Sequence, residues 1–351
     1  MTPQTRQWIL QTKPQAGNKP TFTLLATPIP PLLPNQALVK PLYFSNDPAQ
    51  HVWMTLSPRD QHPARPYAAP IEPGDPIPSF AIAQVIESLC TRIPVGRLVY
   101  ARVTWSDLSI INSQDCLYTL DDVLPTDAKI GITHFMGALG LSGLTAHYGL
   151  YDIACATAND SIVISGAAGA VGSMAVQIAK KMIGCKYVIG IAGTDEKCRF
   201  VEGLGADECL NYRSGSFEED LQRVTKDCVD VYFDNVGGWI LDLMLKRLKS
   251  YGRVAACGAI SQYQTPITGL TNYVDIVTMR LQILGFNVVD AIHKSSAVTN
   301  AILEAWSKGI LVLSDDTETV VDATLEDVPS TWMGIFRGEN KGKMITRVVH
   351  G

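Results

Sequence analysis

A short β-branched run that enters a helical pattern through three evenly spaced glycines constrains this chain more than any other stretch. Residues 161–165 read Ser-Ile-Val-Ile-Ser, which is typical of a buried strand, and Gly166, Gly169 and Gly172 follow. Apolar residues at positions 171, 174, 175 and 178 then share one face of a helix. The stretch therefore predicts a strand, a glycine turn and a helix.

This predicted turn suits a phosphate group. Residues without side chains let the backbone approach a pyrophosphate, and the N–H groups at the positive end of the helix dipole face the anion. A tight turn between a strand and a helix also favours glycine, so the turn alone leaves a purely structural role open. A second strand expected at residues 186–191 supplies the context of a dinucleotide site, which is our interpretation.

Composition narrows the class of protein. A chain of 351 residues with 46% hydrophobic residues is long enough for two or three domains with real cores. The 29 basic and 34 acidic residues form no basic run, so nucleic-acid binding is not expected. Residues 1–10 contain no apolar core of a signal peptide, and no apolar segment is long enough to span a bilayer, so we expect a cytoplasmic protein without a membrane partner.

The eight cysteines and six histidines are dispersed along the chain, with no Cys-x-x-Cys pair and no regular spacing. A disulfide framework or a zinc cluster is therefore not expected, and most cysteines should be small buried hydrophobes. Distant ligands can converge in a fold, but the sequence predicts no metal site.

Two regions of the chain differ in their pattern. Seventeen of the 20 prolines lie in the first 100 residues, which excludes long helices there and predicts a compact β domain. Its strands are expected at residues 21–25, 37–44, 80–87, 97–103 and 109–111. From about Pro125, strand and helix patterns alternate, as in a parallel sheet covered on both faces.

In this second region right-handed crossovers would build a doubly wound sheet. Strands are expected at residues 161–165, 187–191, 229–234, 253–257 and 282–286, and helices at residues 170–182, 196–204, 217–225, 239–248 and 296–308. After Gly309, strands at residues 317–321 and 344–349 flank a helix at residues 328–336. This tail is too short for a core of its own, so we expect it to pack on the first domain.

The end of the second strand bears on the choice of dinucleotide. A site that prefers NAD usually has an acidic residue there, which accepts a hydrogen bond from the ribose 2′-hydroxyl. Here Gly193 and Thr194 follow the strand, and Lys197 can supply a positive charge to a 2′-phosphate. Asp195 and Glu196 keep two alternatives open: an acidic residue that selects NADH, or two acids that suit the helix dipole beside a solvated lysine. We expect NADPH.

Two later strand ends carry small or polar residues, at positions 234–238 and 257–263. Ligands of open α/β sheets bind outside the carboxyl ends of the strands, so both segments point to the same site, although turn glycines explain part of the pattern. Tyr263 is the candidate catalytic residue, because a phenol near a nicotinamide can donate a hydrogen bond to a developing enolate oxygen. Packing is the alternative role of this tyrosine.

Five motifs together resemble one family: GALGLSGLTAHYGL at residues 137–150, AAGAVGS at 167–173, GIAGTDEK at 190–197, FDNVGG at 233–238 and CGAISQY at 257–263. Their combination is similar to the zinc-independent medium-chain dehydrogenase/reductases. Within these it is most similar to the prostaglandin reductase group, which includes plant alkenal double-bond reductases and bacterial curcumin reductase. The resemblance covers about residues 38–348.

The resemblance implies an α/β fold with a doubly wound Rossmann sheet and a GroES-like β-rich domain. The GroES-like substrate domain would span residues 1–124, the Rossmann NADPH-binding domain 125–312, and a C-terminal return to the GroES-like domain 313–351. It implies that hydride passes from NADPH to the β-carbon of a small, apolar α,β-unsaturated ketone or aldehyde, that a proton then adds at the α-carbon, and that no metal takes part. It also implies a homodimer.

The resemblance further implies a set of site residues. Tyr263 would steady the enolate together with the cofactor ribose hydroxyl. Lys197 and Tyr212 would contact the 2′-phosphate. The remaining cofactor-binding residues would be the pyrophosphate turn Gly169, Ala170, Val171 and Gly172, together with Thr194, Asn235, Cys257, Gly258, Ala259, Ile260, Ser261, Phe286, Asn287, Val288 and Asn340.

One segment departs from the family pattern. Family members usually read Ser-x-Asp-Pro-Tyr-Met-Arg where residues 45–51 read Ser-Asn-Asp-Pro-Ala-Gln-His, so Ala49 and His51 replace a tyrosine and an arginine. We expect Ala49, His51 and Tyr67 to line the substrate pocket. Because the unperturbed pKa of histidine lies near neutrality, His51 is either a proton donor or a packed side chain. Trp53 and Trp105 are either further lining residues or core aromatics.

This departure keeps two alternatives to an enone reductase open. One is a quinone or carbonyl reductase, or a specialised biosynthetic enzyme, of the same fold. The other is a protein that binds NADPH without turnover.

Overall fold

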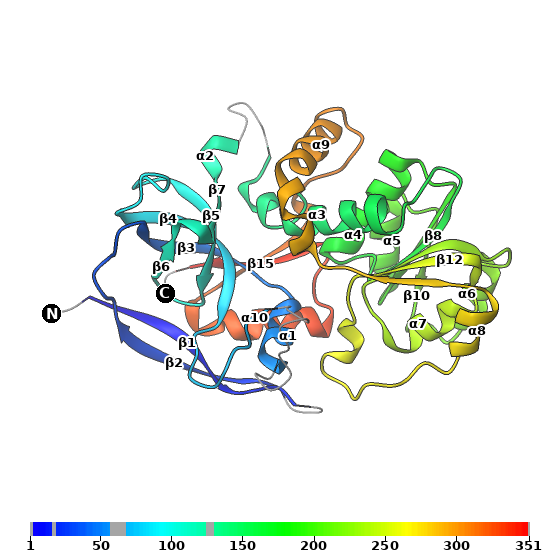
Figure 1. Ribbon diagram of the computed structural model, residues 1–351, viewed down its shortest axis with the longest axis horizontal. Helices are drawn as coiled ribbons and strands as arrows, with labels where there is room; N and C mark the ends of the chain where they lie inside the picture. The colour runs from blue at the N-terminus through cyan, green and yellow to red at the C-terminus, as the bar shows by residue number, and fades with distance from the viewer. Residues whose placement is uncertain (1–2, 16–18, 57–67, 124–129, 350–351) are drawn as a thin grey trace. The chain divides into compact units, whose positions relative to one another are not determined.

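The computed structural model describes residues 3–15, 19–56, 68–123 and 130–349, which form two compact units (Figure 1). The first unit holds the described residues up to Met136 together with residues 320–339 and 344–349, and the second holds residues 137–319 and 340–343. The domain limits predicted from the sequence, after residues 124 and 312, stay a prediction.

The described part of the second unit contains one sheet of six parallel strands in the order β10-β9-β8-β11-β12-β13. The chain starts in the middle, winds outward to β10, crosses back to β11 and winds outward to β13. This is the doubly wound order of dinucleotide-binding domains, and it confirms the predicted fold class. The strands are β8 (Ser161–Ser165), β9 (Tyr187–Ala192), β10 (Glu208–Asn211), β11 (Val229–Asp234), β12 (Leu248–Ala256) and β13 (Gln282–Gly285).

Helices cover both faces of this sheet, which is why Ile162, Val163 and Ile164 of β8 are all fully buried. One packed group consists of α3 (Leu141–Tyr148), α4 (Ala170–Gln177), α5 (Asp195–Leu204) and α9 (Ser295–Ser307). The other shares an apolar cluster and consists of α6 (Phe217–Val224), α7 (Gly238–Leu245) and α8 (Tyr273–Thr278). Both α3 and α4 continue into a π-helical turn, at Gly149–Ile153 and Ile178–Ile183.

The first unit is built on antiparallel strands. Its larger sheet has the order β14-β15-β3-β4-β5-β7, with β6 paired to β3, and β1 pairs with β2 in a separate ribbon. The strands are β1 (Gln4–Thr12), β2 (Thr21–Pro28), β3 (Gln36–Ser45), β4 (Pro78–Ser88), β5 (Leu98–Thr104), β6 (Ser109–Asn112), β7 (Cys116–Thr119), β14 (Glu318–Ala323) and β15 (Lys343–Val348). The helices are α1 (Ala49–Thr55), α2 (Leu120–Val123) and α10 (Val328–Arg337).

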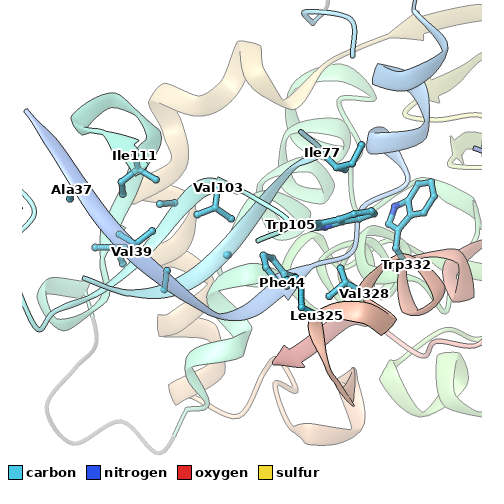
Figure 2. Close-up of a cluster of buried hydrophobic side chains, with 14 of the residues drawn as sticks. Ala37, Val39, Phe44, Ile77, Val103, Trp105, Ile111, Leu325, Val328 and Trp332 are labelled. Carbon is cyan, nitrogen blue, oxygen red and sulfur yellow. The ribbon is translucent and has the colours of Figure 1, made fainter. Parts of the chain in front are cut away.

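The end of the chain completes the core of the first unit. Figure 2 shows Trp332 of α10 beside Trp105, which follows β5, with Phe44 of β3 and Leu325 nearby. The Trp332 indole N–H donates to the Asp47 carbonyl at 3.0 Å, and Ile345 of β15 pairs with Ser45 of β3. Residues from both ends of the chain therefore share one apolar core.

Some elements have no clear signal in the sequence. The edge strand β1 is rich in polar residues, and β10 has only four residues, so neither shows strong apolar periodicity. Helix α3 contains Gly143, a poor helix former, because a Cβ there would lie 1.8 Å from the Ala138 carbonyl oxygen. These elements form because tertiary contacts override local propensity.

No helix in the described residues is long and apolar enough to cross a membrane.

Candidate functional site

The second unit changes its winding direction between β8 and β11, which are neighbouring strands. Open α/β sheets bind ligands at such a switch point, outside the carboxyl ends of the strands. The glycine turn follows β8, and residues 235–238 follow β11. The fold therefore brings two of the segments predicted from the sequence to one edge of one sheet.

The glycine turn is shaped by close backbone contacts. Gly166 has a φ of +57°, and the Gly169 N–H donates to the Gly166 carbonyl at 2.9 Å. A Cβ on Gly172 would lie 2.2 Å from that same carbonyl oxygen, so the first turn of α4 must pass directly over the end of β8. Gly169 caps α4, and its neighbours Ala170 and Val171 begin the helix. The N-terminal end of α4 thus faces the switch point between β8 and β11.

Asp234 at the end of β11 organises the neighbouring segment. Its buried carboxylate accepts hydrogen bonds from the N–H groups of Val236 and Gly237, both at 2.9 Å, and from the hydroxyls of Tyr232 and Ser165 at 2.9 and 3.1 Å. Burial raises the pKa of Asp234. Asp234 is not among the residues predicted from the sequence to belong to the site, although an Asp-Asn pair shortly before two glycines is a common turn signal.

These contacts place Asn235 beside the glycine turn. Its backbone N–H donates to the Ser165 hydroxyl at 3.0 Å, and its side-chain amide donates to the Ser165 carbonyl at 2.7 Å. A Cβ on Gly166 would meet the Asn235 Cβ at 3.3 Å. Asn235 therefore lies where a ligand bound between the ends of β8 and β11 would pass.

The ends of β9 and β10 form a second corner of the site. The Tyr212 N–H donates to the Ala192 carbonyl at 3.0 Å, and its ring lies against Gly193, whose Cβ would come within 3.1 Å of it. The Thr194 hydroxyl accepts the Lys197 N–H at 3.2 Å and so caps α5. Lys197 and Tyr212, the predicted 2′-phosphate residues, therefore lie close to the predicted cofactor-binding residue Thr194.

Arg213 is an additional cation at this corner. Its guanidinium lies 5.6 Å from the centre of the Tyr212 ring, and burial together with the charge of Arg213 lowers the pKa of Lys197. Two cations held near one another favour an anion between them. Arg213 is not among the residues predicted from the sequence to bind the cofactor, although it directly follows Tyr212.

The two acids of the same corner have partners within the protein. Asp195 accepts a hydrogen bond from the Asn211 amide at 2.8 Å, and Glu196 pairs with Lys341 at 3.1 Å. Each carboxylate is thus held by a partner from its own chain, while Lys197 and Arg213 add positive charge to the corner. The arrangement therefore favours NADPH over NADH.

The loop after β12 carries the candidate catalytic tyrosine. Cys257 and Gly258 both donate their N–H groups to the Asp234 carbonyl, at 2.8 and 3.0 Å, which ties the loop to the end of β11. Ala259 precedes a helical turn at Ile260–Gln262, and the Ser261 hydroxyl donates to the Val236 carbonyl at 2.7 Å.

Tyr263 folds back over its own loop. Its hydroxyl accepts the Ala259 N–H at 3.3 Å. Burial and the charge of Asp234 raise the pKa of the nearby Cys257 thiol to about 12, so this thiol stays neutral. The loop therefore presents a phenol, and no thiolate, at the carboxyl edge of the sheet.

The predicted cofactor residues after β13 have mainly structural contacts. The Phe286 ring packs edge-on against Tyr148 and Phe233, with centroids 5.7 and 6.1 Å apart. The Asn287 side chain accepts the Val289 N–H at 3.1 Å and caps the helical turn that begins at Val288. A cofactor role for these three residues stays a prediction.

The segment 340–343 reaches the glycine turn directly. The Gly342 N–H donates to the Ala168 carbonyl at 2.7 Å, and the Asn340 amide donates to the Gly342 carbonyl at 2.7 Å. Gly342 has a φ of +61°, and a Cβ there would lie 1.7 Å from the Thr317 carbonyl oxygen. Asn340 is thereby positioned beside the predicted pyrophosphate turn, which the spacing along the chain does not reveal.

The segment that departs from the family pattern lies in the first unit. Ala49 begins α1 and is half-buried, whereas His51 is only 2% exposed. The His51 ring stacks on Trp332 and contacts Phe336, with centroids 6.4 and 5.5 Å apart. Burial lowers the pKa of His51 to about 4, so the imidazole is neutral at pH 7. These observations favour the packed alternative over a proton donor.

The aromatic candidates near this segment differ in their surroundings. Trp105 is fully buried in the core of the first unit, and Trp53 packs against the same core. This places both among core aromatics. Tyr67 lies outside the described residues. In the described chain no group of three or more His, Cys, Asp and Glu side chains is arranged to hold a metal ion.

Two protein families match this chain, one in each of its two units. The family of the N-terminal domain of oxidoreductases matches residues 6–118, and the zinc-binding dehydrogenase family matches residues 170–304. The fold, the glycine turn and these two family matches together identify the chain as a medium-chain dehydrogenase/reductase.

Three known proteins are similar over nearly their whole length. The NADP⁺-dependent 2-alkenal reductase of Nicotiana tabacum is 34% identical, covering 90% of this chain and 88% of that protein. Prostaglandin reductase 1 of Mus musculus is 34% identical, with 98% and 99% covered. The crystal structure of CurA from Vibrio vulnificus in complex with NADPH is 29% identical, with 99% and 100% covered and a TM-score of 0.84. The chain belongs to the alkenal and prostaglandin reductase group of the zinc-independent medium-chain dehydrogenase/reductases.

Replacement of Gly172 by alanine is expected to disable the glycine turn. The new Cβ would clash with the Gly166 carbonyl, so Gly172→Ala should weaken dinucleotide binding by about tenfold or more, measured by titration calorimetry. Gly203→Ala is the matched control, because a Cβ at this α5 position meets no atom within 4 Å. Equal dinucleotide affinities of the two variants would contradict the role of the glycine turn in dinucleotide binding.

His51 is expected to make the stability of the protein depend on pH. The pKa of His51 is about 4 in the folded state, below the ordinary 6.5. Between pH 4 and pH 6.5 the unfolded chain therefore binds a proton at His51 that the folded chain does not bind. Stability should therefore fall as the pH falls below 6.5 and stay level above it. From pH 7.5 to 5, wild type should lose about 2 kcal/mol more unfolding free energy than His51→Phe.

This difference is measured by urea unfolding at both pH values. His293→Phe, at an exposed histidine, should keep the pH dependence of wild type. Parallel pH profiles of wild type and His51→Phe would show that His51 is not the titrating group.

Proposed function

We propose that this chain is an NADPH-dependent reductase of the carbon–carbon double bond of an α,β-unsaturated ketone or aldehyde. The observation that carries the proposal is that the glycine turn follows β8 and the loop of Tyr263 follows β12, and that both strands flank β11, so the two segments lie at one edge of the Rossmann sheet. The names of the similar alkenal and prostaglandin reductases support this reaction class. The similar CurA structure holds NADPH.

The corner between α5 and β10 supports the choice of NADPH. Lys197 and Arg213 supply positive charge, and the Thr194 and Tyr212 hydroxyls supply donors for phosphate oxygens. The Asp195 and Glu196 carboxylates are engaged with Asn211 and Lys341. The corner therefore favours a 2′-phosphate over a 2′-hydroxyl.

In the proposed mechanism the residues of the chain bind and orient the cofactor and stabilise the charge that develops on the substrate. The N–H groups at the start of α4 would hold the pyrophosphate, with Asn235 and Asn340 beside them. NADPH bound there would supply the hydride for the β-carbon of the substrate.

Tyr263 is the residue proposed to stabilise the reacting oxygen. Its hydroxyl accepts the Ala259 N–H, and a phenol that accepts one hydrogen bond still carries an O–H donor. That donor can be offered to the enolate oxygen as negative charge develops there. The α-carbon then takes up a proton.

The reaction itself is tested with a substrate panel. Purified protein with NADPH deuterated at C4 is offered 2-alkenals, aliphatic enones and quinones, and the products are analysed by mass spectrometry. We expect saturated carbonyls with deuterium at the β-carbon. Allylic alcohols or hydroquinones as the main products would contradict the proposal, and so would tight NADPH binding without any turnover.

Removal of the Tyr263 hydroxyl is expected to slow turnover without loss of cofactor. Tyr263→Phe should lower kcat by about ten- to a thousandfold, because one donor to the developing oxyanion is lost. The dissociation constant of NADPH should change less than about threefold, since the expected contacts to phosphate lie elsewhere. Tyr251→Phe, at an exposed tyrosine of β12, is the matched control and should retain full kcat. An unchanged kcat in Tyr263→Phe would exclude the catalytic role.

We also propose that the protein is a cytoplasmic homodimer. β13 is the edge strand of the Rossmann sheet, and the helix that leads into it exposes Tyr273, Val274 and Val277. Such apolar side chains beside an open sheet edge favour pairing with another copy of the chain.

A further inference from the structure

Two cysteines from different elements face one another near the 2′-phosphate corner. Cys209 of β10 pairs with Gly190 of β9. A Cβ on Gly190 would lie 3.0 Å from the Cys209 sulfur and 2.6 Å from Val201 of α5. The Cys209 side chain therefore points to the face of the sheet that α5 covers.

Cys198 lies on the facing side of α5. It precedes Val201 by three residues and Glu202 by four, which places all three on one face of the helix. The Cys209 N–H donates to the Glu202 carboxylate at 3.1 Å, and the thiols of Cys198 and Cys209 form a hydrogen bond. The two thiols thus face one another across the interface between α5 and β10.

Cys198 is also the more acidic thiol of the pair. The hydrogen bond from Cys209 lowers the pKa of Cys198, whereas the pKa of Cys209 is raised. By contrast, burial raises the pKa of Cys116 and Cys185 to about 11. Cys198 is itself buried, but because the thiolate is the reactive form, its lowered pKa makes it better suited than Cys116 and Cys185 to attack a small oxidant.

We propose that Cys198 and Cys209 form a reversible disulfide in the presence of hydroperoxides, and that this bond weakens the binding of NADPH. The second half of this proposal rests on the proposed function.

The oxidation is a two-step reaction that needs only the peroxide. The Cys198 thiolate attacks the terminal peroxide oxygen, the O–O bond breaks, and the hydroxide or alkoxide that leaves takes up a proton to become water or an alcohol. The sulfenic acid formed on Cys198 is then attacked by the Cys209 sulfur, which forms the S–S bond and releases water. Two electrons pass from the two sulfurs to the peroxide, and a dithiol reverses the change.

The bond would disturb the cofactor corner because both cysteines are close to it in sequence. Lys197 directly precedes Cys198, and Tyr212 lies three residues after Cys209. A disulfide holds its sulfurs about 2.05 Å apart, much closer than two thiols in contact, so α5 and β10 must shift toward each other. Lys197 and Tyr212 would move from their positions in the reduced protein.

The test compares reduced protein with protein treated with hydrogen peroxide. Peptide mass spectrometry should find a Cys198–Cys209 crosslink with the loss of two hydrogens. The KM for NADPH should rise about tenfold, as for one lost charge-assisted hydrogen bond, and dithiothreitol should restore it. The conservative variants Cys198→Ser and Cys209→Ser should lose both responses. Cys155→Ser, at an exposed cysteine of the same unit, should keep both.

Each half of the proposal has its own failing outcome. Absence of the crosslink while Cys155 is oxidised would overturn the disulfide. A crosslink with an unchanged KM, or the same rise of KM in Cys198→Ser, would overturn its effect on NADPH. Failure of the reduced protein to bind NADPH would overturn the proposed function and, with it, the proposed effect of the disulfide on NADPH binding. Peptide mass spectrometry would still show whether the Cys198–Cys209 crosslink forms.

Discussion

The crossing of α4 over the end of β8 is the contact on which the candidate site depends. Gly172 leaves no room for a Cβ above the Gly166 carbonyl, so helix and strand meet backbone to backbone. This close crossing directs the N–H groups at the start of α4 toward the carboxyl edge of the sheet. Gly342 then meets the same turn through the Ala168 carbonyl, which binds a distant segment to it. A bulkier residue at any of these positions would separate elements that the site needs together.

A second constraint is the buried carboxylate of Asp234. A charge in such a place is tolerated when hydrogen bonds replace the lost water, and here four donors surround it. The Asp234 backbone carbonyl meanwhile accepts the N–H groups of Cys257 and Gly258. One residue thus connects the ends of β8, β11 and β12, and the position of the Tyr263 loop depends on it.

In the first unit, the packing around His51 accommodates the departure from the family pattern. Where an arginine is usual, His51 is neutral and lies against Trp332 and Phe336, both from the C-terminal helix α10. An imidazole without charge can be packed against aromatic rings at little cost, whereas a guanidinium would keep its charge. The replacement therefore alters the apolar core of this unit as well as the chemistry that it can offer.

Local patterns in the chain sufficed to predict the doubly wound sheet, the glycine turn and most of the helices, because buried parallel strands and amphipathic helices carry strong periodicity. The polar edge strand β1, the four-residue β10 and the glycine-containing helix α3 could not be predicted in this way. The same limit applies to the site: Lys197 and Tyr212 follow from motifs, whereas the contact of Cys198 with Cys209 and the burial of His51 arise only when separate elements pack. Such contacts join residues far apart in the chain, and no local pattern encodes the distance between them.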